Sequence, residues 1–124
     1  MADIIYKEES YTIIGILFEV YNNLGSGFSE IVYKDAIEYE LKLNSIPFER
    51  EKEFSVAYKN TILNHNSFAD FVVFDKIILE IKSIEKLNDV HTSQCINYLK
   101  VSQHKLAILA NFHREFLDHK RIVL

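Results

Sequence analysis

The sequence predicts a single α/β domain that spans residues 1–124. Three observations lead to this class: apolar residues at helical spacing before Pro47, runs of β-branched and aromatic residues after it, and one further helical stretch between two such runs. Hydrophobic residues make up 48% of the chain, which contains only three glycines and one proline. This composition provides enough apolar surface for one core and no linker to a second domain.

The first helix is expected to begin after Ser10, its N-cap, and to run to about Leu24, with Gly25 as its stop. One face carries an apolar core stripe, and the opposite face is also rich in aromatic residues. That second face either packs inside the monomer or supplies the surface of a homodimer. Its residues are Tyr6, Tyr11, Ile14, Phe18 and Tyr21.

The second helix is expected to follow a flexible Gly-Ser-Gly joint, with Ser29 as its N-cap and an end at about Asn44. Glu30 lies in the first turn of this helix. At helical spacing it shares a face with three apolar residues, so the sequence directs it toward the core. Those residues are Tyr33, Ile37 and Leu41.

The next elements are strands. Residues 48–58 are predicted as one long, bulged strand, followed by a turn at 59–60 and a short strand over 61–63. Two apolar runs, 68–74 and 77–82, then flank a polar Asp-Lys pair that suits a tight hairpin.

A third helix is expected to start at Asn88 or Asp89 and to end near Val101. A strongly apolar strand over 105–112 and an edge strand over 119–123 complete the chain. The predicted order is therefore ααβββ(β)αβ(β).

The hairpin between the two apolar runs carries the residues that indicate chemistry. Side chains alternate along a strand, so Glu80 and Lys82 project to one face. Counting outward from a two-residue turn puts Asp70 opposite Ile81, whereas a shift of one residue at a bulge puts it opposite Glu80. Either arrangement allows the two carboxylates to converge.

Two nearby carboxylates repel one another unless a cation lies between them or one is protonated. Oxygen ligands favour a hard ion, Mg²⁺ or Mn²⁺. Such an ion activates water for attack on a phosphodiester, and Lys82 would position that water or stabilise the developing charge. A Glu-x-Lys pair is also common on exposed strands, but Glu80 lies among apolar neighbours on both faces, where a charge needs a reason.

The third helix carries Gln94 and Tyr98, four residues apart and therefore on one face. Both side chains can hydrogen-bond water or phosphate. His91, one turn earlier, is expected as a surface or capping residue rather than a ligand. Cys95 is the only cysteine, which excludes a disulfide within the chain.

The net charge of −4 argues mildly against non-specific binding to nucleic acid. Basic residues nevertheless outnumber acidic ones over 99–124, where Lys120 and Arg121 are adjacent. This end is either the surface that faces phosphate or a solvated edge. No signal peptide or long apolar segment is found, so a cytoplasmic protein without membrane contact is expected.

Several separated motifs, in order, give the chain a family resemblance. The pattern Gly27-x-x-Glu30-x-x-Tyr33 is followed by Asp70, Glu80-x-Lys82 and Gln94-x-x-x-Tyr98. Together with Asn111-Phe112 and Lys120-Arg121, they resemble the GxxExxY protein family, which is grouped with the PD-(D/E)XK nuclease superfamily. The resemblance implies a restriction-endonuclease-like core, in which helices flank a mixed central sheet.

The resemblance also implies roles for individual residues. Asp70, Glu80 and the backbone carbonyl of Ile81 would bind metal, and Lys82 would be the catalytic lysine. Glu30 would be the helical acid of RecB-like members and a further metal ligand. Gln94 and Tyr98 would be the QxxxY motif, with catalytic roles. Substrate contacts are expected from Gln94, Tyr33, Lys120 and Arg121.

The function predicted is therefore a Mg²⁺- or Mn²⁺-dependent nuclease, acting on DNA rather than RNA. Two alternatives stay open from the sequence. One is a catalytically weak module that uses the nuclease fold to dock a protein or nucleic acid. The other is a phosphodiesterase whose substrate is a small nucleotide, which suits the acidic balance of the chain.

Overall fold

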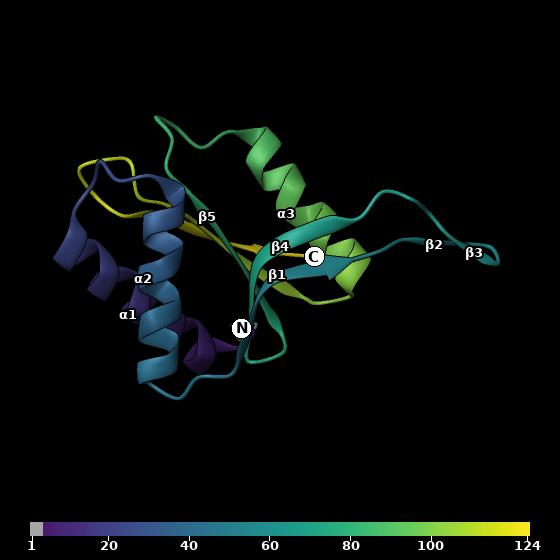
Figure 1. Cartoon of the computed structure of the whole chain (residues 1–124), viewed down its shortest axis with the longest axis horizontal. Coiled ribbons are helices and arrows are strands. Elements are labelled where there is room, and N and C mark those ends of the chain that lie inside the picture. The colour runs from purple at the N-terminus through teal and green to yellow at the C-terminus, as the bar shows by residue number, and fades with distance from the viewer. Residues whose placement is uncertain (1–3) are drawn as a thin grey trace.

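A computed structural model describes residues 4–124 as a five-stranded sheet between two layers of helices (Figure 1). Helices α1 and α2 cover one face, and α3 lies against the other. None of the described helices has both the length and the apolar composition needed to cross a membrane. The elements are α1 (Lys7–Leu24), α2 (Glu30–Leu43), β1 (Phe48–Phe54), β2 (Ala57–Tyr58), β3 (Thr61–Ile62), β4 (Ser67–Val73), β5 (Ile77–Lys82), α3 (Asp89–Ser102), β6 (Leu106–Asn111) and β7 (Asp118–Val123).

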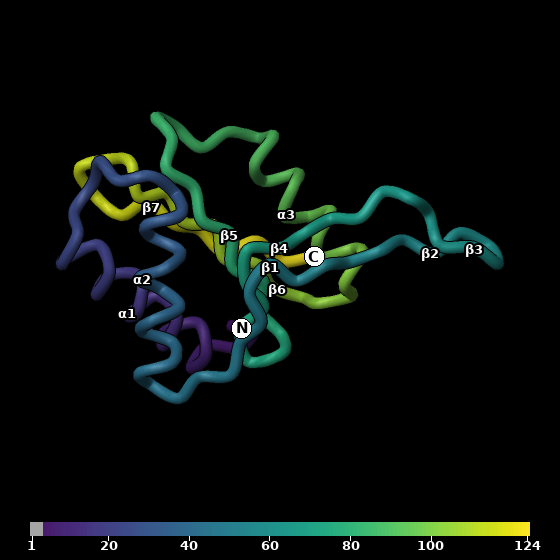
Figure 2. The backbone as a smooth tube through the Cα atoms, viewed as in Figure 1, coloured from purple at the N-terminus to yellow at the C-terminus, as the bar shows by residue number. Residues whose placement is uncertain are grey.

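The strand order in the main sheet is β1-β4-β5-β6-β7 (Figure 2). Neighbouring strands are antiparallel except for β5 and β6, which are parallel. A parallel pair needs a long crossover connection, and α3 forms it. The predicted mixed sheet flanked by helices is therefore confirmed.

The sheet has a buried cluster on each face because most residues of its central strands are apolar on both faces. All six residues of β6 are buried. Toward α1 and α2, the strands contribute Phe71, Val73, Ile77, Leu79, Ile81, Leu106, Ile108 and Ala110. Toward α3, they contribute Ala69, Val72, Ile78, Ala107, Leu109 and Ile122.

The predicted start of the first helix is wrong. The helix begins at Lys7, with Tyr6 as its N-cap, and Ser10 is buried inside it. Tyr6 packs against the core cluster beneath α1 and α2, and acidic residues in the first turn interact favourably with the helix dipole. These contacts extend the helix beyond the point where the capping pattern places its start.

The other two helix starts are confirmed. Ser29 is the N-cap residue of α2, and Asn88 is the N-cap of α3. The Asn88 side chain accepts a hydrogen bond from the Val90 amide, while the Asn88 amide donates to Nδ1 of His91. This reciprocal arrangement is a capping box, so His91 has the expected capping position.

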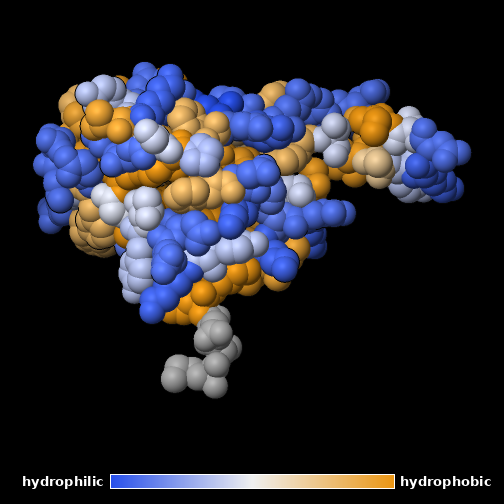
Figure 3. All heavy atoms as spheres, turned by 90° about the horizontal axis from the view of Figure 1, so that it is seen from below, coloured by the Kyte–Doolittle hydropathy of each residue, from blue (hydrophilic) through white to orange (hydrophobic). Residues whose placement is uncertain are grey.

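The predicted long strand over 48–58 is divided in two. β1 stays in the main sheet, whereas β2 pairs only with β3 and forms a separate hairpin that projects from the body as an arm (Figure 1). The arm presents an apolar patch in the space-filling view (Figure 3). Its exposed apolar residues are Val56, Tyr58, Ile62 and Leu63.

Halfway along β1 and β4, the side chains at alternate positions switch from one face of the sheet to the other. Phe48 packs toward α1 and α2, but Phe54, an even number of residues later, packs toward α3. In β1 the change occurs at Glu51, which has a left-handed backbone with φ 52°. The register between the strands is the same on both sides of this point, because β4 changes face at the paired position.

The β4–β5 connection has three residues rather than the predicted two, because Phe74 and Asp75 both adopt left-handed backbone angles. Val73 consequently pairs with Ile77, and Phe71 pairs with Leu79. Continuing this register places Asp70 across from Glu80. Of the two registers considered from sequence, the one shifted by a residue is confirmed.

Tyr33 fixes the loop between α1 and α2 over the sheet. Its ring is fully buried and stacks on Phe112, with 4.4 Å between ring centroids. Its hydroxyl donates to the Gly25 carbonyl at 2.6 Å and accepts from the Phe28 amide at 3.2 Å. The Gly25 carbonyl and the Phe28 amide therefore both form a hydrogen bond with this one hydroxyl.

We therefore predict that Tyr33→Phe lowers the free energy of unfolding by about 1–3 kcal/mol, because it leaves two loop groups without their partner. Urea denaturation monitored by circular dichroism measures the change. Tyr39→Phe is the matched control, since Tyr39 lies on the same helix and is 64% exposed. Equal stability of the two variants would contradict this role of the hydroxyl.

Candidate active site

The two predicted acids lie where β4 and β5 separate. Regular backbone pairing between these strands runs from Val73 and Ile77 to Phe71 and Leu79. Beyond that point, each carboxylate accepts a hydrogen bond from the facing strand. The Asp70 amide donates to Oε1 of Glu80 at 2.8 Å, and the Ile81 amide donates to Oδ2 of Asp70 at 2.8 Å. Side chains thus take the place of backbone acceptors, which fixes both carboxylates.

Both carboxylates are buried, with 7% of Asp70 and 3% of Glu80 exposed. Burial and then the negative charge of Asp70 raise the pKa of Glu80 from its ordinary value of 4.5 to about 8. The hydrogen bond from the Asp70 amide and the charge of Lys82 oppose this rise. A perturbed carboxyl beside a second one is typical of functional sites.

A cation from α2 lies against this pair. The Nζ of Lys34 is 2.8 Å from Oδ1 of Asp70, and only 13% of the Lys34 side chain is exposed. Burial of the ammonium opposes its charged form, but the contacts with Asp70 and Glu51 outweigh that effect and raise the pKa of Lys34. Lys34 is therefore a charged partner of the candidate site.

Two further carboxylates surround the same ammonium. Glu51 of β1 lies 3.4 Å from it, and Glu30, one turn earlier on α2, lies 3.7 Å from it. Arg50 and Glu51 are adjacent in β1, and both contact α2. Regular alternation would turn Glu51 to the other face of the sheet, but its left-handed backbone allows the contact. Glu30 thus approaches Asp70 through Lys34.

Sequence reasoning missed Lys34 and Glu51. Lys34 had a signal, because it lies four residues after Glu30 on the same helical face, but such pairs also occur on solvated surfaces. Glu51 had none, since a left-handed backbone is not expected for glutamate inside a strand.

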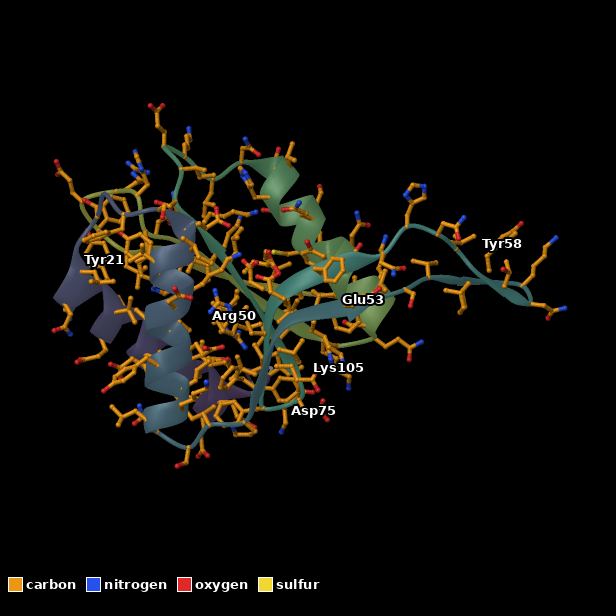
Figure 4. The ribbon with its side chains drawn as sticks, in the orientation of Figure 1. Tyr21, Arg50, Glu53, Tyr58, Asp75 and Lys105 are labelled. Carbon is orange, nitrogen blue, oxygen red and sulfur yellow. The ribbon has the colours of Figure 1, made fainter. Side chains whose placement is uncertain are left out.

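A second ionic contact holds α2 against the sheet beside the site. Arg50 extends from β1 toward α2 (Figure 4), and its Nη1 lies 2.7 Å from Asp35 and 3.8 Å from Glu38. The same guanidinium lies over the ring of Phe71. Lys34 of α2 therefore contacts β4, while Asp35 and Glu38 of α2 contact Arg50 of β1.

The end of β5, which carries Lys82, is held from two directions. The Lys82 carbonyl accepts from the Phe112 amide at 2.9 Å, and the Ser83 hydroxyl donates to the Phe28 carbonyl at 2.9 Å. Asn111 is fully buried, and its amide group donates to the Ile84 carbonyl and accepts from the Ile84 amide. Sequence reasoning gave Asn111 no role, although it belongs to one of the motifs.

On the α3 side, Tyr98 lies within the electrostatic influence of the acids. Burial, and then the charges of Glu80 and Asp70, raise the pKa of Tyr98 to about 12, so it keeps its proton. Gln94 is exposed one turn earlier. No direct hydrogen bond joins it to the acids in the part of the chain that the structure describes.

The structure separates the other predicted substrate contacts. Tyr33 is buried in the core, away from solvent. Lys120 is exposed and in register with Leu109 and Glu80, two strands from the acid. Arg121 instead donates from Nη2 to the Ile5 carbonyl, at the N-terminal end of α1.

The donor set fits a hard divalent ion. Asp70 and Glu80 offer carboxylate oxygens, and Oδ1 of Asp70 already contacts a cation. Over residues 4–124, no three His, Cys, Asp or Glu side chains converge closely enough to share one ion. Ligation by Glu30 would thus require movement of its side chain.

Comparisons with known proteins agree with this geometry. Residues 7–122 match the sequence model of a family described as the PD-(D/E)XK nuclease superfamily. No curated protein matches the chain.

Two solved structures share the fold. The crystal structure of SSO0001 has a TM-score of 0.61 at 20% identity, over 74% of this chain and 48% of that one. An alkaline exonuclease (LHK-Exo) from Laribacter hongkongensis has a TM-score of 0.55 at 10% identity, over 99% of this chain and 72% of its own. The chain thus spans about half the length of SSO0001.

The raised pKa of Glu80 predicts how stability depends on pH without metal. Between about 4.5 and 8, an unfolded chain has lost the Glu80 proton while the folded chain keeps it, so the free energy of unfolding falls as pH rises. Glu80→Gln abolishes this term. We expect the variant to gain on the order of 3 kcal/mol over wild type between pH 4.5 and 8.

Urea denaturation in a chelator across this pH range measures the difference. Glu85→Gln, on the exposed loop after β5, is the control for removal of one carboxyl and should follow wild type. A constant difference between Glu80→Gln and wild type at every pH would show that Glu80 titrates normally.

Proposed function

Because the chain belongs to the PD-(D/E)XK nuclease superfamily, we propose that it is a divalent-metal-dependent nuclease that hydrolyses phosphodiester bonds of nucleic acid, with DNA preferred over RNA. One observation carries the proposal: Asp70 and Glu80 are buried together and held through backbone amides where β4 and β5 separate. A core built for packing alone has no need of two carboxyl groups at this position. Lys82 is two residues after Glu80 on β5, and its charge acts on that carboxyl.

Asp70, Glu80 and the Ile81 carbonyl would hold Mg²⁺ or Mn²⁺, with Glu30 as a further ligand after a change of its side chain. When bound, the ion supplies Lewis acidity for the phosphate and lowers the pKa of water. The amide hydrogen bonds keep both carboxylates in place, so little reorganisation is needed. The Lys82 ammonium stabilises the negative charge that develops on the phosphate.

Residues on the α3 side would orient the substrate. Tyr98 keeps its proton and therefore donates a hydrogen bond to phosphate, and Gln94 presents an amide from the same helical face. Lys120 adds positive charge in register with Glu80. Tyr33 supports the site through the α1–α2 loop rather than by contact with substrate, and Arg121 binds the Ile5 carbonyl at the N-terminal end of α1.

Three finer assignments belong to the proposal. The order of motifs supports membership of the GxxExxY family with a RecB-like site. A homodimer through α1 is supported only by Tyr11 and Phe18, which are 64% and 41% exposed, because Tyr6 and Tyr21 pack against the core. Location in the cytoplasm is likewise proposed from the sequence.

Asp70→Asn is predicted to abolish metal binding and nucleic-acid cleavage together, with a loss of activity of at least about a thousandfold, because it removes a ligand charge. Calorimetry with Mn²⁺ and cleavage of single- and double-stranded DNA and RNA in the same samples test this. Asp75→Asn is the matched control, since Asp75 is exposed in the turn at the other end of the hairpin (Figure 4).

Metal binding without cleavage of any long nucleic acid, but with cleavage of a dinucleotide, would replace the proposal with a phosphodiesterase of small substrates. No metal binding by wild type at millimolar Mn²⁺ would refute the catalytic proposal.

Lys82→Ala is predicted to lower the rate of cleavage by about a hundredfold or more while metal affinity stays within a few-fold of wild type, since the ammonium acts on the reacting phosphate rather than as a ligand. Single-turnover cleavage at saturating Mn²⁺ measures the rate. Lys86→Ala, on the exposed loop beyond β5, is the control. Unchanged cleavage in Lys82→Ala would instead favour a docking module with incidental activity.

A further inference from the structure

The contact of Lys34 with Asp70 is explained neither by the chemistry expected of the fold family nor by the residue roles proposed above. It is the shortest of three contacts that one ammonium makes with carboxylates from α2, β1 and β4. The ammonium lies against Oδ1 of Asp70, while Oδ2 is bound by the Ile81 amide. Oδ1 is thus the Asp70 oxygen without a backbone partner, and therefore the one best suited to a metal ion.

We propose that Lys34 is an internal counter-ion that competes with the divalent metal for Oδ1 of Asp70, so that metal binds only when the ammonium moves away. The inference rests on the proposed function, since it assumes that Asp70 is a metal ligand. Lys34 is then a positioning residue that sets metal affinity.

The charges explain why the competition is built in. Asp70 and Glu80 share a buried region, and an unpaired carboxylate there is costly, so the metal-free protein needs a cation at this point. Lys34 supplies it from a helix whose Tyr33, Ile37 and Leu41 are fixed in the core. A divalent ion would bring more charge to the same oxygen, and close like charges repel.

The surroundings also give the displaced ammonium a place to go. Glu51, which is not among the proposed metal ligands, already lies 3.4 Å from Nζ, and its side chain is 51% exposed. Lys34 can therefore leave Asp70 and keep a carboxylate partner without losing its helix position. Displacement requires a change of side-chain torsion rather than movement of α2.

Titration calorimetry with Mn²⁺ tests the proposal on wild type, Lys34→Met and Lys34→Gln. Both variants remove the charge, and Gln keeps a neutral donor near Asp70 in case Met disturbs folding. We expect each to bind Mn²⁺ about tenfold tighter than wild type. Lys34→Arg restores the charge and should bind within about twofold of wild type.

Lys42→Met is the matched control, because Lys42 lies on the same helix and makes an equivalent contact with Glu38 four residues earlier, 3.6 Å away, at an exposed site. Its Mn²⁺ affinity should equal that of wild type. A second readout is thermal unfolding: Lys34→Met should be less stable than wild type in chelator, and saturating Mn²⁺ should reduce that difference.

Affinity in Lys34→Met and Lys34→Gln equal to or weaker than wild type would overturn the inference, and if Asp70→Asn still loses binding, the proposed function survives. No Mn²⁺ binding by wild type or any Lys34 variant would overturn both. Tighter binding in the Lys34 variants without cleavage of nucleic acid by wild type would support the inference and count against the nuclease.

Discussion

The structure depends on the presence of two carboxyl groups in one buried place. Asp70 and Glu80 face each other where β4 and β5 separate, and each accepts an amide of the opposite strand. Hydrogen bonds satisfy some of their oxygens, but burial and then the negative charge of Asp70 still raise the pKa of Glu80. Positive charge has to be supplied, and the arrangement of the neighbouring elements provides it.

Helix α2 meets that need while it also builds the core. One face buries apolar residues against the sheet, and the adjoining positions direct Lys34 to β4 and Asp35 to Arg50 of β1. The α1–α2 loop is fixed to the end of β5 through Tyr33, Phe28 and Ser83. Packing and electrostatics therefore determine the position of α2 together.

The sequence was sufficient to predict the α/β class, the two strands that carry Asp70 and Glu80, and the convergence of these acids, because these follow from local periodicity and from chemistry within one hairpin. It did not predict that the segment 48–58 divides between the main sheet and a separate hairpin. It did not predict the start of α1, since tertiary contacts of Tyr6 outweigh the capping preference of Ser10. It also missed Glu51, whose position results from a left-handed backbone angle that its residue type does not predict. Contacts between distant segments, such as Lys34 with Asp70, were equally out of reach of local patterns.

The mid-strand change of face in β1 and β4 affects how substitutions in these strands should be understood. One half of β1 supports the core under α1 and α2, and the other half supports the core under α3, with Glu51 between them. Tolerance to polar residues should consequently keep one alternation along β1, because positions 48, 50, 52 and 54 are half-buried and 49, 51 and 53 are exposed, although the half-buried positions face different helices on the two sides of Glu51. An inserted residue at this point would exchange inward and outward positions for half the strand, so evolution can vary the amino acids of β1 much more freely than their number.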